Sequence, residues 1–537
     1  MRTLTQFLFT FIIISISFTY SAGQDNLSTH APPDSNKSES QPAIEDQAYL
    51  LLDQVIAGIG SLKLPENRSR LEMTAAHLLW KRDSERARSL FLQAAGDVVE
   101  LSRQSAGKRN EPFSRYQSLA ELRQKLILTA AKHDAVLAYD LFRKTQPGKD
   151  EIAETGGAEN ESYIEQLLLA EVSQIDPKFA LSKAEEMLDR GVYSLAITST
   201  LAQLQKQDDH AATQLIEKIL GSLRADVLLN SHDAINLTLG LLRTGPRASE
   251  APTGSMVQLS VSAYRRLLET AATAVLKPSP NSGQPSSTKL DQQNARDLLA
   301  NLRPLLPQIE QHLPERYQAL RQKMNELKNA HTGFDRLTYL TQHGASNNLL
   351  TAAFKAVDEG NVDVARQIAN DQLDSEMRAA VLGRIEAQER VRKDKTIQLQ
   401  DLRQTLAETY VLVAGRATNY EQLQNKLQVI RVLGASDPAR TFELIQSGID
   451  QLNELISAAA TLNGFEVEMF VSDEMPLPGN SQLGAMVVQY GQELALLAKS
   501  DFRRAMAAAE QFQYPEASLF ARLSIVEAAL ALNGSVN

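Results

Sequence analysis

The residues whose types and spacing come closest to a functional cluster lie in one acidic segment, 465–483 (FEVEMFVSDEMPLPGNSQL). Its prolines predict a non-helical loop, and exposed loops often carry function. Carboxylates at this density can bind Ca²⁺, but their spacing matches no calcium loop. The simplest interpretation is a solvated acidic loop, with contact with a partner and a metal site as the alternatives. The predicted contact residues are Glu466, Glu468, Phe470, Asp473 and Glu474.

The apolar side chains of this segment allow a simpler explanation. Phe465, Met469 and Phe470 alternate with the acids. If these three side chains pack onto the helices around them, they fix the loop in place. The alternation of apolar and acidic residues then reflects packing of the loop and does not indicate a ligand.

Catalytic spacings are scarce elsewhere. The chain has no His-Glu-x-x-His, no Gly-x-Ser-x-Gly, no phosphate-binding loop and no dinucleotide fingerprint. Two Ser-x-x-Lys matches occur, Ser105 with Lys108 and Ser286 with Lys289. On one helical turn this spacing lets Lys activate Ser, but the companion motifs of such enzymes are missing. We predict no catalytic residue.

Metal and cofactor sites find equally little support. The chain has no cysteine, which excludes disulfides, zinc–thiolate sites, iron–sulfur clusters and thiol nucleophiles. The eight histidines are scattered, and no two have the i, i+4 spacing that places both over one metal ion. We predict structural or surface roles for the histidines, and no metal or cofactor.

The charge balance and the aromatic content argue against two classes of ligand. Net charge is −10, whereas nucleic-acid binding needs a basic face. The basic run at 390–395 (RVRKDK) is short and interrupted, which is typical of a solvated helix face. Aromatic residues make up 6% of the chain, which weighs against a carbohydrate-binding module. We predict no nucleic-acid partner.

A recurring helical phrase must position whatever site exists. An Asp or Asn is followed four residues later by Ala, and then by an apolar residue three or four further on. Asp or Asn caps a helix start, Ala permits close approach of a neighbouring helix, and the apolar residue continues a buried stripe. The phrase begins at Asp83, Asp134, Asp176, Asp208, Asn361 and Asp501, and with Thr in place of Ala at Asp437.

The clearest unit of this kind spans residues 161–221. Asp176-Pro177 predicts a helix start, because Pro suits the first helical position. Gly191 stands where a left-handed C-terminal cap is expected. Strand patterns are almost absent. The chain resembles, in style, a diverged tetratricopeptide-like α-solenoid. We predict an all-α irregular superhelix of antiparallel helix pairs.

Composition divides the chain into segments. Residues 1–23 have the short apolar core of a signal peptide, with an uncleaved N-terminal anchor as the alternative. Residues 24–45 are predicted to be a disordered linker. Two helical-repeat regions, 46–277 and 290–537, follow on either side of a low-complexity linker, 278–289, and the second contains the insertion 465–483. No second membrane span is predicted.

Export and helical repeats together suggest a function. We expect a non-catalytic scaffold that binds a protein partner in the bacterial envelope, either periplasmic or extracellular. One alternative is an envelope hydrolase or lyase that uses acid pairs on facing helices. Another is a protein that binds cell-wall glycan without cleaving it.

Overall fold

The computed structural model describes residues 41–105, 113–148, 157–244, 257–276, 287–330, 366, 378, 415–434, 437–465, 469–477 and 481–532. Within these ranges the fold is all-α and contains no strand beyond an isolated bridge, which confirms the predicted fold class. The predicted signal peptide and the basic run at 390–395 lie outside the described residues.

The helices of the first half of the chain are α1 (Gln41–Ile59), α2 (Pro65–Leu79), α3 (Ser84–Ser105), α4 (Phe113–Ala131), α5 (Ala135–Lys144), α7 (Gly157–Ile175), α8 (Pro177–Asp189), α9 (Ala196–Gln207), α10 (Asp209–Ser222), α11 (Ala225–Asn230), α12 (His232–Arg243) and α13 (Val261–Leu276). Those of the second half are α14 (Ser287–Leu302), the 3₁₀ turn η1 (Arg303–Leu305), α15 (Leu306–His312), α16 (Pro314–Ala330), α20 (Tyr420–Gly434), α21 (Pro438–Leu462), α22 (Gln482–Leu497), α23 (Phe502–Ala509) and α24 (Pro515–Leu532).

The recurring phrase has the predicted structure. The Asp176 carboxylate accepts a hydrogen bond of 3.0 Å from the Phe179 N–H at the start of α8. Ala180, one turn later, is completely buried, and Gly191 has the expected positive φ of 73°. The copy that begins at Asn361 lies outside the described residues. Equivalent caps are made by Asp83, Asp134, Asp208, Asp437 and Asp501.

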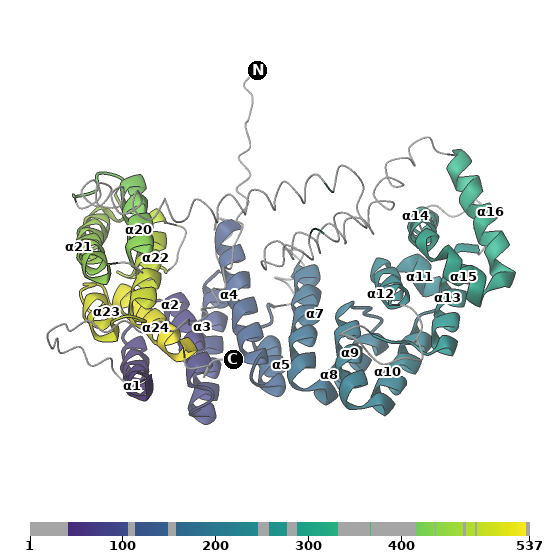
Figure 1. Ribbon diagram of the computed structural model, residues 1–537, viewed down its shortest axis with the longest axis horizontal. Coiled ribbons are helices and arrows are strands. Elements are labelled where there is room, and N and C mark those ends of the chain that lie inside the picture. The colour runs from purple at the N-terminus through teal and green to yellow at the C-terminus, as the bar shows by residue number, and fades with distance from the viewer. Residues whose placement is uncertain are drawn as a thin grey trace, which may run out of the picture.

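Helices α7 to α16 stack largely in chain order and form what we call the arm. Helix α7 packs on α8 and α9, α9 on α10 and α12, α10 on α13, and α13 on α14 and α16 (Figure 1). Each helix buries its apolar stripe against helices close to it in sequence. The arm therefore has the nearest-neighbour packing of a solenoid.

The opposite end of the array joins the two ends of the described chain. Helix α24 packs on α1 and α2, and α22 packs on α20, α21, α23 and α24. Figure 1 shows these yellow and green helices beside the purple helices that begin the described residues. We call this body, α20–α24 together with α1 and α2, the junction. The array thus runs in space from α20 through α24 and α1 to α16.

The predicted domain division stays a prediction about folding units. In the described residues, helices of the two predicted regions pack on each other at both ends of the array. Helix α14 contacts α11, α12 and α13, although the linker 278–289 separates it from them in sequence, and α24 contacts α1.

Two predicted boundaries need correction. The disordered linker 24–45 and the low-complexity linker 278–289 both run into helices, which begin at Gln41 and Ser287. Polar and small residues and proline favour loops, but they also favour the first turn of a helix, where backbone N–H groups lack helical partners. Composition alone therefore does not separate the end of a loop from the first turn of the helix that follows it.

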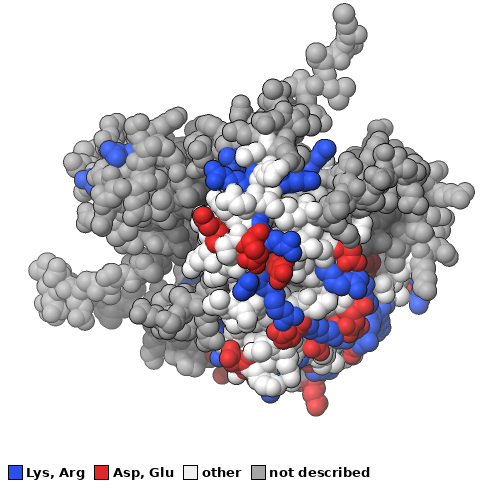
Figure 2. Space-filling model, turned by 90° about the vertical axis from the view of Figure 1, so that its right-hand side faces the viewer, with Lys and Arg blue, Asp and Glu red and all other residues white. Residues whose placement is uncertain are grey.

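The surface at the far end of the arm mixes charges of both signs. Figure 2 shows blue and red side chains interspersed on this face. Exposed ion pairs link neighbouring helices of the arm, as in Lys218–Asp189 at 2.8 Å and Arg266–Glu217 at 2.6 Å. Exposed pairs of this kind contribute about 0–1 kcal/mol each. In the described part of the chain, no helix combines the length and apolar character that crossing a bilayer requires.

Candidate functional site

The acidic segment singled out in the sequence connects the two ends of the chain. Glu474 is buried, and its carboxylate accepts hydrogen bonds from the backbone N–H groups of Lys63 and Leu64, the second at 2.9 Å. These two residues precede α2, more than 400 positions away in sequence. Phe470 is also buried, with its ring centroid 6.1 Å from that of Tyr514. The segment thus fastens the C-terminal helices to the start of α2.

A tight two-residue turn directs Glu474 toward α2. Val471 and Glu474 exchange two backbone hydrogen bonds, of 2.9 and 3.0 Å. Ser472 and Asp473 between them have positive φ angles of 53° and 65°. This backbone region is unfavourable for residues other than glycine, and the surrounding contacts must stabilise it. The turn leaves Asp473 at the surface, 3.1 Å from the Lys63 ammonium.

Two further buried polar side chains complete this connection. Asn67 on α2 donates to the carbonyl of Met475 at 3.0 Å and accepts from the N–H of Leu477 at 2.8 Å. Glu516 on α24 accepts from the N–H of Met475 at 3.1 Å. Backbone groups of an irregular segment are thereby satisfied by side chains from helices at both ends of the chain, as burial requires.

These contacts divide the predicted partner-contact residues. Phe470 and Glu474 are occupied within the chain, whereas Asp473 is exposed. Glu466 and Glu468 lie outside the described residues. Packing as the simpler explanation fits Phe470 and Met469, which contact the core. Contact of this loop with a partner stays a prediction.

Phe465 differs from its two aromatic and apolar neighbours in the segment. Its side chain is 87% exposed. The packing alternative therefore fits Phe470, which is buried, and Met469, which is half-buried, but not Phe465.

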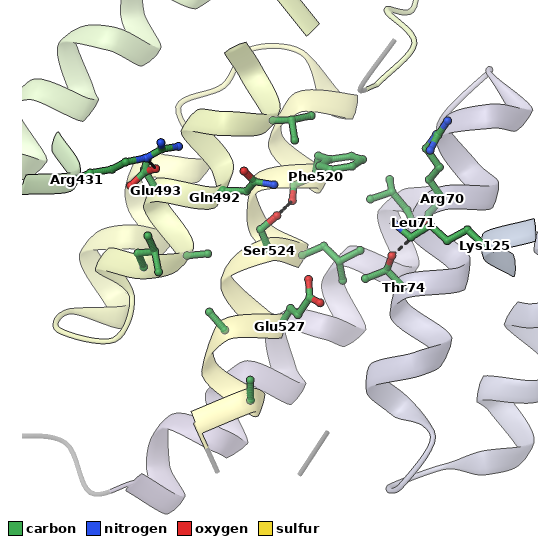
Figure 3. A pocket seen from close by; sticks show the side chains of 16 residues that line it. Arg70, Leu71, Thr74, Lys125, Arg431, Gln492, Glu493, Phe520, Ser524 and Glu527 are labelled. Atoms are coloured by element: carbon green, nitrogen blue, oxygen red, sulfur yellow. Dashed lines mark hydrogen bonds and ion pairs between the residues drawn. The ribbon is translucent and has the colours of Figure 1, made fainter. Parts of the chain in front are cut away.

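A groove of about 660 Å³ crosses the junction and is our candidate site. Figure 3 shows side chains of α2 and α4 facing those of α22 and α24 across it, with Arg431 of α20 at the far end. Its wall is largely apolar, and charged groups stand along it, the arrangement typical of binding sites. The lining residues are Arg70, Leu71, Thr74, Lys125, Arg431, Val488, Gln492, Glu493, Ala495, Leu496, Phe520, Leu523, Ser524, Glu527, Ala528 and Ala531.

The charged groups of the groove are partly neutralised. Arg431 forms an ion pair with Glu493, whose side chain is only 3% exposed. Burial raises the pKa of Glu493, and the bonded Arg431 opposes that rise. Arg70 pairs with Glu66 at 2.9 Å. Lys125 is exposed at the α4 side of the groove. The groove therefore offers separated positive groups above an apolar floor.

The hydroxyl groups in the groove are bonded to their own helices. Ser524 donates to the Phe520 carbonyl at 3.0 Å, and Thr74 donates to the Arg70 carbonyl at 2.9 Å (Figure 3). A serine nucleophile needs a base that accepts its proton. Here each hydroxyl proton is held by a backbone carbonyl, so neither hydroxyl is placed as an activated nucleophile.

A second groove of about 410 Å³ continues the first across α22. The two share Arg431, Glu493 and Leu496, and the second extends to the start of α21 at Pro438. Leu496 is 54% exposed between them. An exposed leucine at the centre of an extended groove is the kind of apolar anchor that protein interfaces bury.

Sequence reasoning missed this groove entirely. Its walls come from α2, α4, α20, α22 and α24, which are brought together only by packing between the two ends of the chain. The one available signal was Leu496, an apolar residue adjacent to the buried stripe of Leu494 and Leu497. A single such residue is common on protein surfaces.

A histidine pair also escaped the spacing search. His77 of α2 and His133, just after α4, lie with Nδ1 and Nε2 2.6 Å apart. His133 stacks on Trp80, with ring centroids 4.9 Å apart. Burial lowers the pKa of His77, and burial together with His77 lowers that of His133 to about 4. The pair is therefore neutral at pH 7 and can share one proton in a hydrogen bond.

The remaining sequence candidates form no site among the described residues. Ser105 is the last residue of α3, while Lys108 and Ser286 lie outside those residues. The described part of the chain holds no group of three or more His, Asp or Glu side chains placed to bind a metal ion.

Comparison with known proteins does not assign the chain to a family. No protein-family model matches the sequence, and no curated protein matches it. One solved structure, described as a circular tandem repeat protein with novel repeat topology and enhanced subunit contact surfaces, aligns at 14% identity over 91% of this chain and 100% of that chain, with a TM-score of 0.14. A score this low supports no conclusion, so the α-solenoid-like fold rests on the helix packing itself.

Proposed function

We propose that this protein is a non-catalytic helical scaffold of the bacterial envelope that binds a segment of a protein partner in the groove over α22. The observation that carries this proposal is the pair of adjoining grooves with Leu496 exposed between them. The short apolar segment at residues 1–23 supports the proposed export.

The dimensions and chemistry of the groove favour a peptide segment over a small metabolite. It extends across several helices and is open to solvent along its length, so it can accept an extended or helical segment with apolar side chains. Val488, Phe520 and Leu523 supply apolar contact area. Arg70 and Lys125 can bind carboxylates on the edge of the same segment.

One observation supports the hydrolase or lyase alternative. Glu493 and Glu527 come from different helices and line the same groove. A carboxylate pair can act as general acid and base. However, Glu493 is held by Arg431 and lies almost completely out of solvent, which suits a structural ion pair better than proton transfer to a substrate.

Site-specific photo-crosslinking tests the scaffold proposal. A benzophenone amino acid replaces the exposed Gln492 of the groove, in the full chain expressed with its N-terminal segment in a bacterial host. A matched probe at Gln214, exposed on α10 of the arm, serves as the control. We expect a reproducible protein adduct from position 492 alone. The same products from both positions, or none from either, would contradict the proposal.

A pair of leucine variants locates the contact. Leu496→Asp places a charge at the centre of the groove and should abolish the adduct. Leu50→Asp, at a leucine that is 63% exposed on α1, should leave it unchanged. Incubation of the purified protein with peptidoglycan, with and without Leu496→Asp, tests the glycan alternative. Retention on glycan that depends on Leu496 would favour glycan binding over a protein partner.

A further inference from the structure

A small pocket between α1, α2 and α3 is separate from the groove. Its volume is about 240 Å³, and none of its lining residues lines the larger grooves. Ile59 and Leu90 form buried apolar wall, and Ile56 continues it toward the surface. The complete lining is Ile56, Ala57, Ile59, Gly60, Glu72, Arg86, Ser89, Leu90 and Gln93.

Glu72 gives this pocket an unsatisfied acid. Glu72 is only 6% exposed, and its Oε2 atom is buried without a hydrogen-bond partner. A buried carboxylate oxygen without a partner is costly, because it has lost its water and gained nothing in return. Such a group in the wall of a pocket indicates a position for a donor.

Arg68, whose charge acts on Glu72, does not satisfy its unpartnered oxygen. Arg68, one turn earlier on α2, binds Asp97 through both Nε and Nη2 and donates to the carbonyls of Leu62 and Lys63. Burial and the Asp97 carboxylate raise the pKa of Glu72 to about 7, and Arg68 opposes that rise. Glu72 is therefore poised between its charged and neutral forms and lacks a cation of its own.

The rest of the pocket also favours a positive group. It lies at the carboxyl end of α1, which finishes at Ile59, and the helix dipole makes that end negative. Arg86 at the rim is paired with Asp53 at 2.5 Å, and Ser89 is bonded to Gln93 at 3.2 Å. The rim groups thus satisfy one another and leave Glu72 as the polar group that needs a donor.

We propose that this pocket binds a primary alkylammonium group, with the ammonium donating to Glu72 and the alkyl chain lying against Ile56, Ile59 and Leu90. An ammonium supplies both the missing donor and the missing charge, and a chain of about four carbons fits the apolar wall. This chemistry has two sources: the side chain of a lysine presented by another protein, or a free amine.

Titration of the full chain with n-butylammonium, followed by NMR or calorimetry, tests the proposal, with butan-1-ol as the uncharged control. We expect saturable binding of butylammonium that is at least about tenfold tighter than that of butanol, as charge-assisted hydrogen bonds require. No saturable binding of butylammonium, or equal binding of butanol, would overturn the proposal.

Variants identify the pocket. Glu72→Gln is isosteric and should weaken butylammonium binding at least about tenfold, whereas Glu85→Gln, at an exposed acid on α3, should leave it unchanged. Ala57→Phe, at an exposed position of the rim, should block entry without altering the carboxyl and provides a second test if Glu72→Gln folds poorly. Binding that survives both variants overturns the proposal.

The two sources of the ammonium are distinguished by two further ligands. Nα-acetyl-lysine amide carries the backbone of a presented lysine, and butane-1,4-diamine represents a free amine. Tighter binding of the lysine derivative assigns the pocket to a protein lysine, and tighter binding of the diamine assigns it to a free amine. Failure of both to compete with butylammonium would overturn the proposal.

Discussion

The junction and the arm are both built from packed helices, but their buried polar contacts connect different parts of the chain. In the arm, buried polar contacts join residues that are close in sequence, such as Ser173 and Thr200, 27 positions apart. In the junction, they join residues more than 400 positions apart, such as Leu64 and Glu474. Damage in the arm should therefore stay local, whereas damage in the junction should separate the two ends of the chain.

The largest effect should come from Asn67→Ala at the junction. The substitution leaves the Met475 carbonyl and the Leu477 N–H buried without partners, which should cost about 3 kcal/mol of unfolding free energy. The matched variant in the arm is Asn294→Ala, whose side chain donates to the Leu229 carbonyl at 2.7 Å and should cost about 1 kcal/mol. Urea denaturation followed by circular dichroism measures both, and equal losses would remove the distinction between the two regions.

Two glycines, Gly448 in the junction and Gly240 in the arm, allow a second comparison of packing in the two regions. A Cβ on Gly448 would lie 2.2 Å from the ring of Tyr490, which is completely buried and cannot move aside. Gly448→Ala should cost about 2.5 kcal/mol through overpacking. A Cβ on Gly240 would lie 2.6 Å from Leu195, which is 51% exposed and can rotate away.

Gly240→Ala should therefore be neutral, or stabilising by up to about 1 kcal/mol through helix propensity. Thermal unfolding of both variants measures the difference. A loss at Gly240 as large as that at Gly448 would show that the arm is packed as rigidly as the junction.

Overpacking can also be tested inside the arm. Ala180 is completely buried, so Ala180→Leu should cost about 2 kcal/mol. Ala439→Leu, at an exposed position of α21, should change stability by less than about 0.5 kcal/mol. Because arm contacts are local, the melting temperature should fall for Ala180→Leu while the crosslink at Gln492 persists. An unchanged melting temperature would mean that Ala180 does not mark a close helix contact.

The smallest effect concerns pH at the contact between α2 of the junction and His133, which lies in the turn between α4 and α5. Folding lowers the pKa of His133 from an ordinary 6.5 to about 4, so the folded chain binds fewer protons than the unfolded chain between these values. The stabilising contribution is complete above pH 6.5 and is lost as the pH falls toward 4. Reduced for partial exposure, the loss is about 1 kcal/mol.

The neighbouring cations Lys81 and Lys132 also lower the pKa of His133. His133→Gln should flatten the dependence of stability on pH between 6.5 and 4. Melting temperatures of the unmodified protein and of the His133→Gln variant, measured at pH 7 and pH 4.5, test this prediction. An identical pH dependence in the variant would assign the effect to other groups.

The features that were predicted correctly from the sequence depend on residues close together in the chain. The caps at Asp134, Asp176 and Asp437 were found because each bonds an N–H three residues along the chain. The non-helical character of segment 465–483 is an equally local property, and it holds for the described residues between α21 and α22, whereas the last two residues of the predicted segment already belong to α22, which begins at Gln482. What that segment does was not recognised, because the N–H groups that Glu474 binds lie at the other end of the chain.

The helical class, the capped helix starts and the buried alanines follow from local sequence, since each depends on residues within one or two turns. That the chain ends meet, that the groove opens over α22 and that His77 lies against His133 follows only from packing between distant segments. The physical reason is that an apolar stripe specifies burial but not the partner that buries it. The apolar stripes of α1 and α24 do not by themselves specify which helix packs against them. Shape complementarity over the whole array selects the pairing.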